Sequence, residues 1–452
     1  MYMIKKIALK LGFDKAIMFT SSTSIFGAIG SVISVILVVK YLTGIEQGFY
    51  YTFGSIVAIQ VFFELGLNGI ITQYVAHEAS NLVWENESIL SGESKFKSRL
   101  SSLLHFSVKW YLFFAIILLI TLLIVGFVFF NRYDKTGGVV SWVSPWILLA
   151  IGTVVNLMVS PIVAFIQGLG KVKEIAKIQL LILFVRLAIV WGGLILGAKL
   201  FVLGIGSFIT AFLLILIIAV QYRKLLINIW KTEIVEKVHY RSEIFPYQWK
   251  IALSWISGYF IFQLFNPVLF ATEGAVVAGQ MGMTLAALNG IQSLALAWIT
   301  TKVPLFSGLI AQKEYSKLDS IFNITLKQSA LINLAGLFFL MLVIFLIRYF
   351  NIELSGKLLG NRFLNYLPLF LMMVPVFLNQ LTSGWATYLR CHKKEPFLIN
   401  SIVVGVLCAL STVLLGKYFG VLGVTLGYCL IIIAMFPWGY YIFKTKKSEW
   451  HV

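Results

Sequence analysis

Three charged side chains lie inside long apolar stretches of the sequence: Glu64, Arg186 and Lys302. Placing a charge inside a bilayer costs roughly 2.5 kcal/mol or more, so each group is expected to face protein or a wet cavity. A carboxylate in such a place can neutralise a neighbouring cation, or it can bind a coupling proton or cation. The sequence leaves both roles open for Glu64, as the counter-ion of Arg186 or as an ion-coupling residue.

Twelve apolar stretches hold these charges and take up most of the chain. A hydrocarbon core of about 30 Å needs roughly 20 helical residues to cross it. The 452 residues are 60% apolar with a mean hydropathy of +0.92, which leaves little sequence for soluble domains. Helices are favoured over a β-barrel because the stretches are continuously apolar. The predicted spans cover residues 17–39, 48–72, 107–130, 143–166, 178–198, 201–220, 250–271, 283–310, 328–348, 363–384, 397–415 and 420–443.

The basic residues predict the orientation of the chain, because short loops rich in Lys and Arg stay in the cytoplasm. Of 36 Lys and Arg, 26 fall on one predicted face and 8 on the other, which places both termini in the cytoplasm. The net charge of +18 is spread over seven segments, so it favours topology and contact with membrane lipids over nucleic-acid binding. Each intramembrane charge then lies roughly 12 Å inside the cytoplasmic boundary, at about 1.5 Å per residue.

The predicted cytoplasmic stretch 221–249 divides the spans six and six, which gives an N-terminal half over 1–225 and a C-terminal half over 226–452. A weak internal repeat supports this division, since Glu46-Gln47-Gly48 after the first span resembles Glu273-Gly274 after the seventh. Halves with an even number of spans would form a parallel repeat about the membrane normal. Coincidence is the alternative.

The first helical hairpin carries a family resemblance. Residues 42–50 read Leu-Thr-Gly-Ile-Glu-Gln-Gly-Phe-Tyr, Phe63-Glu64-Leu65-Gly66-Leu67 follows, and the hairpin closes at 73–78 with Gln-Tyr-Val-Ala-His-Glu. This pattern resembles the start of Wzx-type polysaccharide repeat-unit flippases, a family of the multidrug/oligosaccharidyl-lipid/polysaccharide exporter superfamily. Elsewhere the resemblance rests on span count, length and the Gly-Lys turn at 167–171.

The resemblance implies an all-α polytopic protein of the bacterial inner membrane, with about twelve transmembrane helices in two six-helix lobes around a central cavity. By alternating access it would move a polyprenyl-diphosphate-linked oligosaccharide to the periplasmic leaflet, for O-antigen or other surface polysaccharide. Proton or sodium coupling and a partnership with polymerase machinery are also implied. Lipid II flippases of the superfamily usually carry fourteen spans, so twelve disfavours a peptidoglycan precursor as cargo.

Candidate substrate-binding residues follow from this cargo. Arg186 can grip phosphate oxygens in a fork and Lys302 adds a mobile point charge, so the two cations suit a diphosphate. Gln60, Asn68 and Asn289 could bind sugar hydroxyls, although hydrogen bonds between helices would satisfy these amides equally well. Lys302 could instead extend its stem to the cytoplasmic surface. The small residues Gly27 and Ser31 on one face of the first span are expected to serve helix packing.

Two rival functions remain. A multidrug exporter of the same superfamily would require an acidic or aromatic cavity for cationic cargo, whereas two of the three intramembrane charges are basic. A glycan polymerase or ligase would resemble enzymes with a large periplasmic loop, and the longest predicted one, 349–362, is short. The five histidines lack the His-Glu-x-x-His spacing and no Walker-type motif occurs, so we expect a protein without a catalytic site, metal or cofactor.

Overall fold

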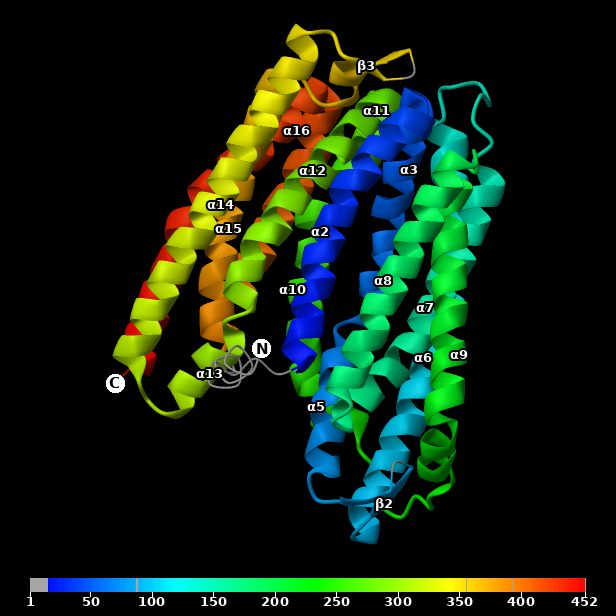
Figure 1. Cartoon of the computed structure of the whole chain (residues 1–452), viewed down its shortest axis with the longest axis vertical. Helices are drawn as coiled ribbons and strands as arrows, with labels where there is room; N and C mark the ends of the chain where they lie inside the picture. Colours follow the sequence, from blue (N-terminus) through cyan, green and yellow to red (C-terminus); the bar gives the residue numbers. More distant parts are fainter. Residues whose placement is uncertain (1–14, 87, 355, 393, 452) are drawn as a thin grey trace, which may run out of the picture. The chain divides into compact units, whose positions relative to one another are not determined.

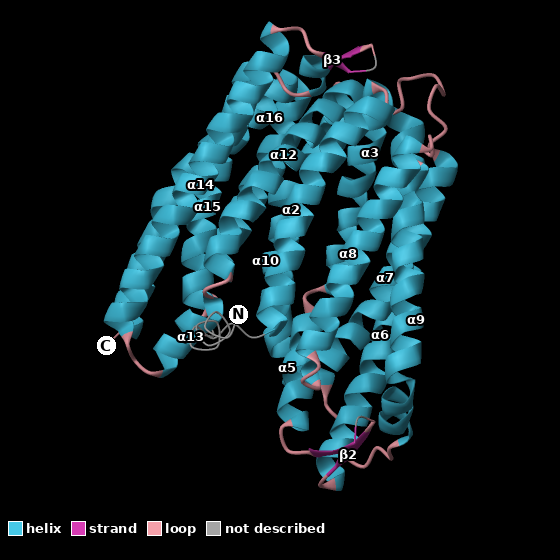
Figure 2. Ribbon diagram, in the orientation of Figure 1, coloured by secondary structure: helices cyan, strands magenta, loops and turns pink. Residues whose placement is uncertain are grey.

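The computed structural model describes residues 15–86, 88–354, 356–392 and 394–451 of the chain. Helices make up most of this part (Figures 1 and 2). Its strands form two short antiparallel hairpins, β1 (Val83–Asn86) with β2 (Ile89–Ser91) and β3 (Glu353–Leu354) with β4 (Lys357–Leu358). The prediction of an all-α polytopic fold is therefore confirmed.

The chain divides into two compact units. Unit 1 comprises residues 1–55, 133–140 and 257–452, and unit 2 comprises 56–132 and 141–256. Unit 1 contains α2 (Lys15–Tyr41), most of α3 (Gly44–Val57), α11 (Phe265–Thr272), α12 (Ala275–Thr300), α13 (Val303–Ala311), α14 (Tyr315–Tyr349), η3 (Leu359–Arg362), α15 (Tyr366–Arg390) and α16 (Leu398–Trp450). Unit 2 contains η1 (Ala58–Gln60), α4 (Val61–Glu64), α5 (Leu67–Ala79), α6 (Ser94–Tyr133), α7 (Val143–Gly168), α8 (Val172–Ile195), α9 (Phe201–Lys231), the π-helix η2 (Tyr240–Ile244) and most of α10 (Phe245–Phe262). The sequence-based halves 1–225 and 226–452 stay a prediction.

The number of spans depends on how bent and merged helices are counted. Nine helices of the described chain are long and apolar enough to cross a membrane, and two bent pairs raise this number to eleven. The helix α16 holds 53 residues and contains a break at Gly420 (φ 56°, ψ −139°). Counting it as two segments gives the predicted twelve.

Close contacts show that the chain reverses direction within α16. A Cβ built on Gly427 would lie 2.1 Å from Ser411 Oγ, and one on Gly423 would lie 2.4 Å from the Leu415 carbonyl oxygen. In a straight helix, Ser411 and Gly427 would be roughly 24 Å apart at about 1.5 Å per residue. The segments 398–419 and 421–450 are therefore antiparallel helices that meet at a glycine with a positive φ.

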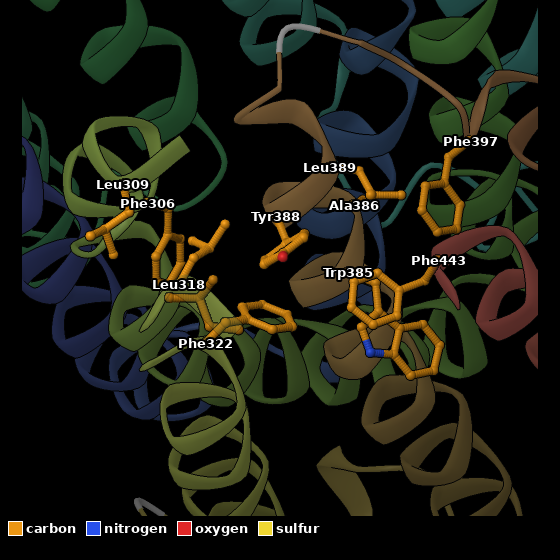
Figure 3. Packing of buried hydrophobic residues seen from close by; sticks show 11 residues of the cluster. Phe306, Leu309, Leu318, Phe322, Trp385, Ala386, Tyr388, Leu389, Phe397 and Phe443 are labelled. Atoms are coloured by element: carbon orange, nitrogen blue, oxygen red, sulfur yellow. The ribbon is translucent and has the colours of Figure 1, made fainter. Parts of the chain in front are cut away.

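An aromatic cluster in unit 1 joins four of its helices. Figure 3 shows Phe306 of α13 near Leu318 and Phe322 of α14, while Tyr388 and Trp385 of α15 continue the cluster toward Phe443 of α16. Phe306, Phe322 and Tyr388 are fully buried. Because α13 is only nine residues long, this packing, rather than helix length, fixes its position.

In unit 2 the second predicted span is broken in its middle. The helix α4 ends at Glu64, and both Leu65 (φ 50°) and Gly66 (φ 66°) adopt left-handed conformations before α5 begins. The two helical parts of this span are bent by 40°. A Cβ on Gly66 would lie 2.3 Å from Ile251 Cγ2, so the Glu-Leu-Gly sequence allows a tight contact as well as the break.

Candidate functional site

Lys302 occupies the junction between α12 and α13. Pro304 stands in the first turn of α13, where the missing N–H of proline ends the preceding helix and tolerates a new start. The Lys302 backbone bridges the junction, since its N–H donates to the Ile299 carbonyl at 3.0 Å and its carbonyl accepts from Phe306 N at 2.9 Å. Its side chain is partly exposed. Within the described chain, its ammonium has no hydrogen bond or ion pair.

A polar pocket of about 380 Å³ lies between α2 and α12, which run side by side in Figure 1. Its last lining residue, Thr300, precedes Lys302 by two residues. Its polar lining residues are Thr23, Ser24, Ser31, Asn289, Ser293 and Thr300, and the others are Gly, Ala and Leu. The contributions repeat every three or four residues, so one face of each helix lines the pocket. No charged or aromatic residue is among its described lining residues. Asn289 is the one predicted site residue that lines it.

Several pocket hydroxyls donate to carbonyls of the helices and so keep lone pairs for a ligand. Thr23 donates to the Phe19 carbonyl at 2.9 Å, and Ser31 donates to the Ala286 carbonyl at 3.4 Å. Asn289 is exposed and makes no hydrogen bond with the described residues. The pocket therefore offers hydroxyl acceptors together with an amide that can both donate and accept.

A second cavity, of about 850 Å³, begins at Val303, directly after Lys302. The face of α13 that carries Ser307 lines it, together with Thr387 and the residues around the end of α15. Arg390 at its rim is neutralised by Glu395, with nitrogen–oxygen distances of 2.7 and 3.0 Å. Burial lowers the pKa of His392, so its imidazole is neutral at pH 7. Lys302 thus stands in sequence between two cavities of unit 1 whose polar groups are mostly uncharged.

Glu64 belongs to a hydrogen-bonded chain in unit 2. The Asn68 Nδ2 donates to Glu64 Oε1 at 2.7 Å, and the Tyr111 hydroxyl donates to Asn68 Oδ1 at 2.8 Å. Tyr111 lies on α6 and is 1% exposed. The amide of Asn68 is therefore bound by protein at both ends. The sequence did not single out Tyr111, although a tyrosine inside an apolar span requires a partner for its hydroxyl.

The structure does not join Glu64 to Arg186. Arg186 is exposed on α8, where its Cγ lies 4.0 Å from a Cβ built on Gly206. Among the described residues its guanidinium makes no ion pair or hydrogen bond. Gln60 is partly buried in η1 and its amide likewise has no described partner. The functional roles of Glu64, Arg186, Gln60 and Asn68, and their layer with Lys302, stay predictions.

Other amides within the spans are held by hydrogen bonds inside each unit. Asn156 donates to the Ser207 carbonyl at 3.0 Å, and Asn266 donates to Ser55 Oγ at 3.0 Å. Gln380 donates to Ser329 Oγ at 2.5 Å. These side chains serve helix packing, which distinguishes them from Asn289.

The fold is similar to that of known transporters. No protein-family model matches the sequence, and no curated protein matches it either. Among solved structures, the lipid II flippase MurJ in an inward closed conformation has a TM-score of 0.57 at 14% identity, over 96% of this chain and 90% of that one. A MATE in complex with MaL6 gives 0.56 at 15%, over 96% and 97%. An inward-facing multidrug resistance MATE family transporter of the MOP superfamily gives 0.52 at 15%, over 93% and 99%.

At these identities the similarity establishes the fold. The chain is a multi-pass membrane protein with the all-α fold of MATE-type transporters and of MurJ.

Proposed function

We propose that this chain is a flippase that moves a polyprenyl-diphosphate-linked oligosaccharide from the cytoplasmic to the periplasmic leaflet of a bacterial inner membrane. The observation that carries the proposal is that Lys302 follows Thr300 of the polar pocket by two residues and directly precedes Val303 of the second cavity. A cation without a described partner suits a diphosphate, and the hydroxyl and amide groups of the polar pocket suit a neutral glycan. The fold shared with a lipid II flippase supports a lipid-linked cargo.

The finer parts of the proposal follow from the sequence. Arg186 would provide a second contact to the diphosphate, and Gln60 and Asn68 would bind the glycan with Asn289. Glu64 would act in proton or sodium coupling, and its bond to Asn68 would hold its carboxylate in one orientation. The product would pass to surface-polysaccharide machinery such as a polymerase for O-antigen. Both termini would lie in the cytoplasm.

The test is surface glycan in cells that depend on this chain. Lys302→Ala should reduce surface glycan about tenfold or more, the factor expected when a charge-assisted hydrogen bond is lost. Lys302→Arg should keep part of the activity because the charge remains. Lys327→Ala removes an exposed lysine on α14 and is the matched control. Normal glycan in Lys302→Ala cells at equal protein level would reject the headgroup assignment.

Multidrug export is the second candidate, because two of the three structures described above are MATE proteins. A cationic drug would require acidic or aromatic partners, and the described lining of the polar pocket contains neither. Drug susceptibility separates the two functions. Resistance to cationic drugs that depends on this chain, with unchanged surface glycan, would favour the exporter.

A further inference from the structure

Residues far apart in the sequence meet at one end of unit 1. They come from the corner between α2 and α3, from the start of α12, and from the loop between α14 and α15. The sequence assigns all three segments to the periplasmic face. The first segment belongs to the predicted half 1–225, and the other two belong to 226–452.

Arg362 is the centre of this contact and is only 7% exposed. Its Nη2 donates to the Leu42 carbonyl at 2.9 Å, and its Nη1 donates to Gln47 Oε1 at 3.3 Å. Lys357 Nζ donates to the same Leu42 carbonyl at 3.0 Å. Two cations from one loop therefore hold Leu42, the residue after α2, and one of them also holds Gln47 in the first turn of α3.

Gln47 ties the same corner to α12. Its Nε2 donates to the Gly279 carbonyl at 2.8 Å and to the Arg362 carbonyl at 3.2 Å. The side chain is 1% exposed, so an exchange of these partners for water requires the corner to separate from α12. Gln47 is thus hydrogen-bonded to both C-terminal segments.

The backbones of α3 and α12 approach each other at glycines. A Cβ on Gly48 would lie 1.9 Å from the Ala275 carbonyl oxygen, and one on Gly279 would lie 2.9 Å from Gly48 N. A capping box shapes the corner, since Thr43 N donates to Glu46 Oε2 at 2.8 Å and Glu46 N donates to Thr43 Oγ1 at 3.1 Å. The sequence Thr-Gly-Ile-Glu-Gln-Gly therefore builds a surface that fits α12 closely.

We propose that Gln47, Lys357 and Arg362 form a latch that closes the periplasmic end of the transport path and opens when cargo is released. This inference rests on the proposed function. In alternating access the two predicted halves separate at one face at a time. Separation at the periplasmic face would break the bonds that Gln47, Lys357 and Arg362 make, because each joins 42–48 to the C-terminal half.

The first experiment measures access from outside the cell. A chain with Cys391, Cys408 and Cys429 replaced by serine carries one reporter, Ser293→Cys, in the polar pocket. An impermeant thiol reagent applied from outside should label this reporter slowly. Arg362→Lys keeps a charge but cannot span both acceptors, so labelling should become about tenfold faster, as expected when one charge-assisted bond no longer favours the closed state.

Arg348→Lys is the matched control for the labelling experiment. Arg348 donates to the carbonyls of Gly360 and Leu364 at 3.0 and 2.9 Å, so it braces the same loop without touching the α2–α3 corner. Its replacement should leave the labelling rate unchanged. Equal rates in the Arg362→Lys and unaltered chains, or equal acceleration by both lysine variants, would overturn the latch.

A disulfide provides the second test and leaves the latch residues intact. A Cβ on Gly44 would lie 4.0 Å from Val276 Cγ1, so Gly44→Cys with Val276→Cys brings two thiols into bonding range. Oxidation should stop transport and reporter labelling, and reduction should restore both. Labelling of the reporter does not depend on which cargo is carried. If the disulfide changes labelling but leaves surface glycan unchanged, the result counts against the proposed cargo and not against the latch. Wild-type transport in the oxidised protein would reject the latch itself.

Discussion

Two groups of cations have opposite surroundings. The first comprises Arg348 in the last turn of α14 and Lys357 and Arg362 in the loop that follows, and the second comprises Lys302 and Arg186 within the predicted spans. Arg348, Lys357 and Arg362 donate to backbone carbonyls within unit 1. Lys302 in unit 1 and Arg186 in unit 2 have no hydrogen bond or ion pair with any described residue. A cation with satisfied donors stabilises the fold, whereas one with unsatisfied donors in an apolar segment is available to a ligand. The contrast therefore distinguishes cations that bind the fold from the two cations proposed to bind cargo.

Eight cations lie on the predicted periplasmic face, against the positive-inside pattern. Each makes an interaction within the described chain, such as the Tyr41 ring at 5.2 Å from Lys40 and the Thr272 carbonyl at 3.2 Å from Lys135. The full set is Lys40, Arg132, Lys135, Lys199, Arg348, Lys357, Arg362 and Lys417. These cations thus differ from Lys302 and Arg186, whose charged groups make no such interaction with any described residue.

The largest expected effect is on stability at Arg362. Arg362→Ala leaves Gln47 Oε1 without its buried donor and the Leu42 carbonyl with Lys357 alone, which should cost about 3 kcal/mol. Thermal unfolding of the purified protein in detergent measures this loss. The Lys302→Ala protein should unfold at the same temperature as the unaltered protein, because the Lys302 ammonium has no described partner to lose. Equal destabilisation by both changes would remove the distinction between the two kinds of cation.

A smaller effect is expected where a buried hydroxyl holds another polar group. Tyr111→Phe removes the hydrogen bond to Asn68 Oδ1 and should cost about 1 kcal/mol of unfolding free energy. Denaturation of the detergent-solubilised protein would measure it. Tyr418→Phe alters an exposed ring and should have no effect. A Tyr111→Phe protein as stable as the unaltered one would show that the hydrogen bond from Tyr111 to Asn68 does not contribute to the free energy of unfolding.

Glu64 gives a sharper test of role than of stability. The glutamine in Glu64→Gln can still accept from Asn68, so unfolding free energy should change by about 0.5 kcal/mol or less. An ion-coupling role predicts that transport loses its pH dependence in this variant. A large drop in protein level that Arg186→Gln rescues would instead support a buried ion pair, contrary to the geometry.

The smallest expected effect is a pH dependence at the end of α16. Burial lowers the pKa of His451, and the nearby Lys447 also lowers it, while Asp319 opposes the shift. As pH falls below about 6.5, the His451 imidazole therefore binds a proton in the unfolded chain before it does so in the folded chain, and this favours unfolding. This stability contribution is present above pH 6.5 and declines below it. His451→Asn should reduce the change in the unfolding midpoint between pH 7.5 and about 5.5. A pH dependence equal to that of the unaltered protein would contradict the assignment.

The sequence predicted the spans well because long apolar runs have few alternatives to a membrane helix. The last two predicted spans, 397–415 and 420–443, match the antiparallel parts of α16. The break after Glu64 was beyond prediction, since Leu65 adopts a left-handed conformation that its own residue type disfavours. A contact with Ile251, distant in sequence, accompanies this break.

The site was predictable in part, for a geometrical reason. Depth in the membrane follows from sequence position, but rotation of each helix about its axis depends on packing. Glu64 and Arg186 share a predicted depth, yet no described ion pair joins them. Asn289, predicted to bind substrate, lines the polar pocket, and Ser31, expected to serve packing, lines the same pocket. Tyr111 was missed because its role appears only when α6 is placed beside Asn68.

The single-residue turn of α16 has a consequence for biogenesis. Gly420 leaves no hydrophilic loop between the last two helices, and the Glu273 carboxylate accepts a hydrogen bond from Val421 N at 2.5 Å. With so short a turn, insertion of the first helix places the second at the bilayer boundary as soon as it is synthesised. The pair is thus expected to enter the membrane as one helical hairpin. A polar epitope inserted after Gly420 should hinder integration far more than one inserted after Gly137, in the open loop following α6.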